Sequence, residues 1–168
     1  MKAIILDRDG IITKCMPSHQ YLTKLSEVQY LAENIIVFEK IKKEIPIFIV
    51  TNQQGVGKGL MTSKILDSIN NKILKHLKKY NIKILKIYNY PHLESDNCNC
   101  RKPKPGMLLR IAKEFEINLS ESLFIGDSET DIACANNVKS KSIYFGYKKI
   151  KSTPTFKAAN SIELLKIL

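Results

Sequence analysis

The stretch that decides the fold is Ala3-Ile4-Ile5-Leu6-Asp7-Arg8-Asp9-Gly10. Its short apolar run predicts a strand buried on both faces, and the two carboxylates and the glycine that follow predict a polar loop at the end of that strand. Similar apolar runs predict four more strands, at residues 46–50, 83–88, 122–125 and 142–145.

Segments with apolar residues at helical spacing lie between these runs. They cover residues 31–42, 63–80, 107–115, 129–136 and 161–168, and Thr62 is placed to cap the second of them. Strands that alternate with helices predict parallel βαβ units with right-handed crossovers. With 168 residues, we therefore expect one α/β domain, a three-layer Rossmann-like parallel sheet with a loop insert at about 89–105.

The composition is that of a globular protein with an excess of positive charge. Hydrophobic residues make up 44% and charged residues 26%, and the formal net charge is +11. No apolar run approaches the roughly 20 residues of a membrane span, so we expect no membrane partner. Subtracting the three arginines from the 27 basic residues leaves 24 dispersed lysines. This bias does not favour a dedicated nucleic-acid surface, and nucleic acid is the less favoured partner.

The four cysteines, Cys15, Cys98, Cys100 and Cys134, do not form a disulfide framework in a chain of this length. A reducing compartment fits them best. The first residues also lack the apolar stretch and cleavage site of a secretory signal. We therefore expect a cytoplasmic protein.

Polar side chains follow three of the predicted strands at their carboxyl ends, where ligands bind in parallel sheets. Asp7 and Asp9 follow the first strand, Thr51 follows the second, and Asp127 and Asp131 follow the fourth. Each aspartate alone could equally cap a helix or form a turn. Together, carboxylates from two strand ends suit Mg²⁺, which prefers hard oxygen ligands.

Four motifs resemble those of the haloacid dehalogenase-like (HAD-like) phosphohydrolases. They are Asp7-Arg8-Asp9-Gly10, Thr51-Asn52-Gln53, Arg101-Lys102-Pro103-Lys104-Pro105-Gly106 and Gly126-Asp127 through Asp131. They occur in the family's order, and the resemblance extends from residue 3 to about 147. It implies a HAD-like fold without a large cap domain and a Mg²⁺-dependent phosphatase that works through an aspartyl-phosphate.

The resemblance also implies a role for each motif residue. Asp7 is the nucleophile, and Asp9 is the acid that protonates the leaving oxygen and the base that later activates water. Thr51 donates to the phosphoryl oxygens, and Lys102 offsets their charge.

A set of Mg²⁺ ligands follows from the same resemblance. The Asp7 carboxylate, the Asp9 carbonyl and Asp127 hold the ion. Asp131 either holds the water shell of the metal or orients Lys102, and the sequence leaves both roles open.

The predicted insert contains Tyr90-Pro91-His92 and Cys98-Asn99-Cys100. It resembles the zinc-loop branch of the superfamily, which includes the histidinol-phosphate and heptose-bisphosphate phosphatases, where C-P-H and C-x-C form a Cys₃His site. Tyr90 stands at the first cysteine position. His92, Cys98 and Cys100 could therefore hold Zn²⁺ only with a fourth ligand from Asp96, Cys15 or water. Otherwise the loop has no metal and packs through Tyr90.

Candidate substrate contacts are Asn52, Gln53, Gln54 and Lys58 in the glycine-rich loop, together with Arg101. Arg101 matches the arginine with which the heptose-bisphosphate enzymes contact their substrate. A guanidinium can grip a second phosphate at two points. The resemblance implies a monomer that acts on a small phosphorylated metabolite. We expect the substrate to be D-glycero-D-manno-heptose 1,7-bisphosphate, hydrolysed at C7. This substrate would place the enzyme in the carbohydrate metabolism that supplies lipopolysaccharide precursors.

Three alternatives stay open from the sequence. One is a histidinol-phosphate phosphatase, and another is a polynucleotide 3′-phosphatase, whose anionic substrate would suit the positive charge. The third and least favoured is a HAD-fold binding module without activity.

Overall fold

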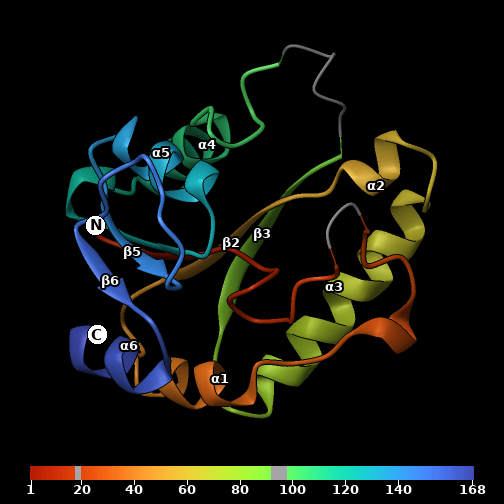
Figure 1. The fold of residues 1–168 in the computed structure, drawn as a ribbon, viewed down its shortest axis with the longest axis horizontal. Coiled ribbons are helices and arrows are strands. Elements are labelled where there is room, and N and C mark those ends of the chain that lie inside the picture. The colour runs from red at the N-terminus through yellow and green to blue at the C-terminus, as the bar shows by residue number, and fades with distance from the viewer. Residues whose placement is uncertain (18–19, 92–97) are drawn as a thin grey trace.

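A six-stranded parallel sheet forms the centre of the protein (Figure 1). The computed structural model describes residues 1–17, 20–91 and 98–168. The strands lie in the order β3-β2-β1-β4-β5-β6. Their bounds are β1 (Ile4–Leu6), β2 (Ile47–Asn52), β3 (Ile84–Tyr90), β4 (Leu123–Gly126), β5 (Lys141–Phe145) and β6 (Phe156–Ala158).

Helices cover both faces of the sheet (Figure 1). One face carries α1 (Ala32–Glu39), α3 (Ser63–Lys78) and α6 (Ser161–Ile167), and the other carries α4 (Gly106–Phe115) and α5 (Glu129–Asn136). The short helix α2 (Gln54–Gly57) follows β2, and two 3-10 turns are η1 (Leu25–Glu27) and η3 (Leu119–Glu121). The three-layer α/β prediction is confirmed.

The two cores follow from the alternation of side chains along the strands. In β1, Ile4 and Leu6 pack into the cluster that contains α1, α3 and α6, whereas Ile5 packs into the cluster that contains α4 and α5. In β2, Ile49 and Phe48 divide in the same way. Strands that are apolar at every position are therefore buried on both faces, as the sequence predicted.

The register of the central strands fixes where the site forms. Leu6 pairs with Ile49 of β2 on one side and with Ile125 of β4 on the other. The residues that follow these three strands therefore lie at the same edge of the sheet.

Helix starts confirm one predicted cap and add another. The Ile65 N–H donates to the Thr62 Oγ1 at 3.2 Å, as expected for α3. Helix α5 begins with a capping box in which Ser128 and Asp131 satisfy each other's backbone N–H.

Some predicted boundaries were wrong, and β6, α2 and the two 3-10 turns were missed. Strand β3 continues through Asn89 and Tyr90, which we had placed in the insert, and α1 ends at Glu39 instead of 42. Strand β6 was missed because it has three residues at the sheet edge, two of them exposed, and so has no apolar run. Helix α2 has four residues, two of them glycine, and so has no periodicity to read. Among the described residues, no helix combines the length and the apolarity that crossing a bilayer requires.

Candidate active site

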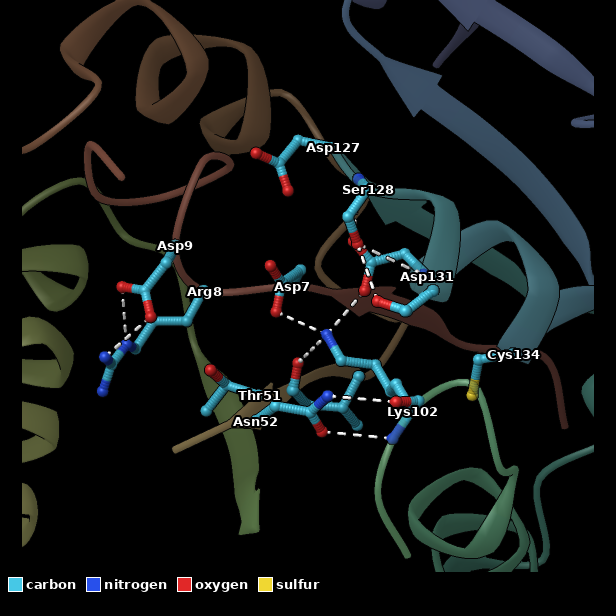
Figure 2. Close-up of polar contacts among 12 residues, drawn as sticks. Asp7, Arg8, Asp9, Thr51, Asn52, Lys102, Asp127, Ser128, Asp131 and Cys134 are labelled. Atoms are coloured by element: carbon cyan, nitrogen blue, oxygen red, sulfur yellow. Dashed lines mark hydrogen bonds and ion pairs between the residues drawn. The ribbon is translucent and has the colours of Figure 1, made fainter. Parts of the chain in front are cut away.

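Lys102 lies at the centre of a buried cluster of charges (Figure 2). Its Nζ is 2.6 Å from Asp7 Oδ1 and 2.6 Å from Asp131 Oδ1, and it donates to the Val50 carbonyl at 3.2 Å. Burial alone would lower the pKa of Lys102, but the carboxylates of Asp131 and Asp7 outweigh it and raise the pKa. The lysine is therefore a fixed positive charge beside Asp7.

Asn52 holds the backbone of Lys102 in place. The Asn52 Nδ2 donates to the Lys102 carbonyl at 3.2 Å, and the Lys102 N–H donates to the Asn52 Oδ1 at 3.1 Å. Because both polar atoms of its amide are engaged in this way, the structure joins Asn52 to the segment that carries Lys102.

Asp131 is wholly buried and ties α5 to Lys102. Its Oδ2 accepts hydrogen bonds from the Ser128 N–H at 3.1 Å and from the Ser128 Oγ at 2.6 Å. A Cβ at Gly126 would lie 2.6 Å from Asp131 Oδ2, so this close approach requires glycine. Asp131 therefore contacts Lys102, as one of its two predicted roles requires.

Asp9 belongs to a second, separate network. The wholly buried Arg8 grips its carboxylate at two points, Nε to Oδ1 at 3.0 Å and Nη2 to Oδ2 at 2.8 Å, and Arg8 Nη1 donates to the Asn70 Oδ1 at 3.1 Å. Thr13 and Gln53 also donate to Asp9, each at 2.8 Å. Burial alone would raise the pKa of Asp9, but the charge and hydrogen bonds of Arg8, with those of Thr13 and Gln53, lower it.

Three carboxylates gather where the strands end. One oxygen each from Asp7, Asp127 and Asp131 lies within 4.8 Å of the others. Burial raises the pKa of Asp7 well above its usual range, with Lys102 opposing, and burial and the charge of Asp131 raise the pKa of Asp127 to about 6. A concentration of negative charge at this strand end is the arrangement that a divalent cation relieves.

Gly10 and Cys15 border Asp127. Gly10 has a φ of +91°, which favours glycine, and a Cβ there would overlap the Asp127 carboxylate. The backbone conformation and the close contact therefore both require glycine. The Cys15 thiol donates to Asp127 Oδ2 at 3.4 Å, and burial and the Asp127 charge raise the pKa of Cys15. The thiol therefore stays protonated and acts as a donor.

Three of the candidate substrate contacts, Gln54, Lys58 and Arg101, form a chain at the surface together with Tyr21. Arginine nitrogens only donate, so we orient the Gln54 amide with its oxygen toward Arg101, where it accepts from Nε at 2.8 Å and Nη2 at 3.2 Å. The other end of this amide lies 3.4 Å from the Tyr21 hydroxyl, which accepts from Lys58 Nζ at 2.8 Å. The two cations, Arg101 and Lys58, are thus joined through Gln54 and Tyr21.

The predicted zinc ligands are only partly described. Cys98 and Cys100 are half-buried and pack against the core cluster around α4. His92 and Asp96 lie outside the described residues, and Cys15 is engaged with Asp127. The zinc site therefore stays a prediction.

Comparison with known proteins decides the family. The chain is 36% identical over 140 residues to the D-glycero-alpha-D-manno-heptose-1,7-bisphosphate 7-phosphatase of Campylobacter jejuni, covering 81% of this chain and 77% of that protein. The chain belongs to the HAD-like phosphatases. The HAD-hydrolase-like family model matches residues 99–153 of this phosphatase.

A second relative and a solved structure are also heptose-bisphosphate phosphatases. This phosphatase is 34% identical over 143 residues to the D-glycero-beta-D-manno-heptose-1,7-bisphosphate 7-phosphatase of Helicobacter pylori strain 26695, which covers 83% of this chain and 80% of that one. Its fold matches the D,D-heptose 1,7-bisphosphate phosphatase of B. bronchiseptica, crystallised with magnesium and phosphate, with a TM-score of 0.87 and 24% identity over 99% and 97% of the two chains. The predicted superfamily and the HAD-like fold are confirmed.

The sequence did not indicate several residues that contribute to the site. Arg8 was quoted in a motif but given no role, and Ser128 and Tyr21 were given none either. Asn70 did leave a signal, because it is a buried polar residue on the apolar stripe of α3, between Ile69 and Ile73. A polar side chain on such a stripe indicates a buried polar partner.

Proposed function

We propose that this phosphatase hydrolyses a sugar phosphate, D-glycero-D-manno-heptose 1,7-bisphosphate at C7, with Asp7, Asp9, Thr51 and Lys102 as its catalytic residues. The observation that carries the catalytic assignment is the buried contact between Lys102 Nζ and Asp7 Oδ1 at 2.6 Å, beside the group of three carboxylates. A buried lysine and a buried aspartate at the end of a parallel sheet form a site ready to receive a phosphoryl group.

The reaction divides into two displacements at phosphorus. First, the Asp7 carboxylate oxygen attacks phosphorus, the bond from phosphorus to the sugar oxygen breaks, and Asp9 gives its proton to that oxygen. Then a water oxygen attacks phosphorus, Asp9 takes the proton of the water, and the bond to Asp7 breaks to release phosphate. Thr51 and Lys102 stabilise the charge on the phosphoryl oxygens in both steps.

The chain's donor set fits Mg²⁺. Asp7 and Asp127 offer carboxylate oxygens from two strand ends, and the raised pKa values of both carboxyls reflect burial that a cation would offset. Bound there, Mg²⁺ would supply positive charge that keeps the Asp7 carboxylate ionised and orients the anionic substrate. Asp131 is already paired with Lys102, and this pairing fixes how far Lys102 lies from the carboxylates of Asp7 and Asp127.

Two features support heptose bisphosphate as the substrate. The relatives named above act on this bisphosphate according to their names, in its alpha or its beta form. The surface chain of Arg101, Gln54, Tyr21 and Lys58 places two cations beside the site, suited to a phosphate that is not hydrolysed.

A panel of phosphate esters assayed with Mg²⁺ tests the proposal. We expect kcat/KM to be highest for one anomer of heptose 1,7-bisphosphate, with release of the C7 phosphate, and Arg101→Ala to raise KM for the bisphosphate more than for heptose 7-phosphate. Preference for a 3′-phosphorylated oligonucleotide would contradict the proposal. Asp7→Asn protein serves as the inactive control.

Histidinol phosphate is the second candidate. The chain is 34% identical over 157 residues to the histidine biosynthesis bifunctional protein HisB of Blochmanniella floridana, covering 89% of this chain but 43% of that protein. Histidinol phosphate has one phosphate and a cationic amine. Repulsion between that amine and Arg101 is the reason we rank it below the bisphosphate.

A further inference from the structure

The Gln53 side chain connects two of the proposed catalytic residues. It is 2% exposed, and its Nε2 donates to Asp9 Oδ2 at 2.8 Å and to Thr51 Oγ1 at 2.8 Å. A carboxylate without its proton only accepts hydrogen bonds, so the amide nitrogen is the atom that must face Asp9. An amide nitrogen carries two hydrogens, and both are used here.

The backbone explains why Gln53 takes this place. Side chains alternate along β2, so Thr51 points to one side and Asn52 to the other, toward the backbone of Lys102. Gln53 is the first residue after β2, and its side chain lies on the side of Thr51, to which it donates. The Gln53 N–H donates to the Tyr90 carbonyl at 2.7 Å, which anchors the residue to the end of β3. The amide is thus held from the backbone as well as from its two partners.

For Thr51 the bond from Gln53 decides where the hydroxyl hydrogen points. A hydroxyl has one hydrogen to give, and the lone pair that faces Gln53 is occupied by the amide. The hydrogen must therefore point away from Gln53, and it stays available for an oxygen of the phosphoryl group. Without Gln53, the Thr51 hydroxyl could rotate and donate its hydrogen to another acceptor.

For Asp9 the same bond completes the set of donors. Its Oδ1 accepts from Arg8 Nε and Thr13 Oγ1, and its Oδ2 accepts from Arg8 Nη2 and Gln53 Nε2. Each carboxylate oxygen has two acceptor positions, so all four are filled. One donor must withdraw before Asp9 can carry or accept a proton. Gln53 is the one donor among these that also holds Thr51.

We infer that Gln53 is a positioning residue that couples Thr51 to Asp9, and that it does not bind substrate as the sequence suggested. The inference rests on the proposed catalytic roles of these two residues. When a phosphoryl oxygen takes the Thr51 hydrogen, the charge on Thr51 Oγ1 changes and the amide strengthens its bond there at the expense of Asp9. Arrival of substrate thereby frees an acceptor position on the acid and base.

The test separates kcat from KM. Loss of a group that binds the substrate before reaction raises KM, whereas loss of a group that orders the transition state lowers kcat. We expect Gln53→Met, which keeps the length but removes both donors, to lower kcat by up to roughly 100-fold, the cost of a catalytic group misplaced by about 1 Å, with KM nearly unchanged. In Gln53→Met the Asp9 Oδ2 is freed but no longer held by the amide, so proton transfer to the leaving oxygen suffers from a misplaced acid. The fall should therefore be smaller with 4-nitrophenyl phosphate, whose leaving group needs less protonation.

Two further glutamines serve as matched comparisons. Gln29→Met makes the same change at an exposed position and should leave both constants unchanged. Gln54→Met, at the neighbouring residue that bonds Arg101, should raise KM for the bisphosphate and spare kcat. Circular dichroism confirms that each variant is folded. Should Gln53→Met fail to fold, Gln53→Glu keeps the shape and is expected to lower kcat in the same way.

The outcomes are distinct. A raised KM with unchanged kcat in the Gln53 variants would show a substrate contact and overturn the inference, and so would unchanged values of both constants. An equal loss of kcat with the sugar phosphate and with 4-nitrophenyl phosphate would overturn the coupling to Asp9. These ratios can be measured with any ester that the wild-type protein hydrolyses, so they test Gln53 even if heptose bisphosphate proves to be the wrong substrate. A wild-type protein that hydrolyses no ester would overturn the proposed function and this inference together.

Discussion

Replacing Gly126 by alanine tests whether the fold depends on the close contact between β4 and Asp131. A Cβ at this position would lie 2.6 Å from Asp131 Oδ2 and nearer still to the Asp131 Cβ, which is wholly buried. Asp131 cannot rotate away without leaving Lys102 Nζ, 2.6 Å distant, or the Ser128 groups that it accepts from. The extra methyl group must therefore displace one of these contacts.

The expected cost combines two effects. Overpacking of a filled core costs about 1–3 kcal/mol, and a weakened helix cap at Ser128 costs about 1 kcal/mol. We take about 3 kcal/mol as the loss in free energy of unfolding, which for a chain of this size lowers Tm by about 6–12 °C. Displacement of Lys102 by about 1 Å should also lower kcat by roughly 100-fold.

Thermal unfolding and phosphate release measure the two parts. Gly59→Ala is the matched control, because no atom lies within 4 Å of its added Cβ and only the strain of a φ of +69° remains, worth about 1 kcal/mol. We expect Gly59→Ala to melt slightly below the wild type and to keep its activity. If Gly126→Ala melted no lower than Gly59→Ala and kept the wild-type kcat, the reasoning from the Asp131 contact would be wrong.

Three more predictions follow from the charges of the site. Asp7→Asn should reduce phosphate release to the background rate with an unchanged circular dichroism spectrum, because it removes the nucleophilic carboxylate and little volume; retained activity would exclude an aspartyl-phosphate. Removing divalent cations with EDTA should abolish hydrolysis. Mg²⁺ added at 100 times its Kd should raise the free energy of unfolding by about 2.7 kcal/mol and raise Tm accordingly; a Tm that does not change with Mg²⁺ would count against the site. Without divalent cations, the pKa of Asp127 is raised from its usual 3.8 to about 6, so the folded state binds the proton more tightly and gains stability as pH falls from about 7 toward 4. Urea unfolding at several pH values should show this gain in the wild type, and it should be smaller in Asp127→Asn.

The parts of the site that the sequence predicted are those that local pattern and sheet geometry determine. Apolar runs followed by Asp7, Thr51 and Asp127 indicate strand ends, and parallel strands bring their carboxyl ends to one edge. Lys102 follows no strand, and its place beside Asp7 was expected only from the family resemblance. The structure puts it there through the two hydrogen bonds between Asn52 and the Lys102 backbone.

The parts that the sequence did not predict depend on contacts between distant residues. Asn70 meets Arg8 across 62 residues of sequence, and Gln53 meets Asp9 across 44. No local periodicity encodes which buried amide will satisfy which buried charge, since that depends on how α3 and β2 pack beside β1. We therefore assigned Gln53 to substrate binding from its position in a motif, whereas the structure shows both its donors already engaged inside the protein.

The partners of Lys102 also bear on when activity arises during folding. Its Nζ contacts Asp7, the residue after β1, and Val50 of β2, contacts that span 95 and 52 residues of the chain. Closing such long loops costs entropy that only a nearly assembled sheet can repay, so the contacts form late. On the ribosome, the residues of β1, β2 and α3 are synthesised long before Lys102 and Asp131 emerge. Catalytic turnover therefore reports completed folding, and no partly folded intermediate should release phosphate.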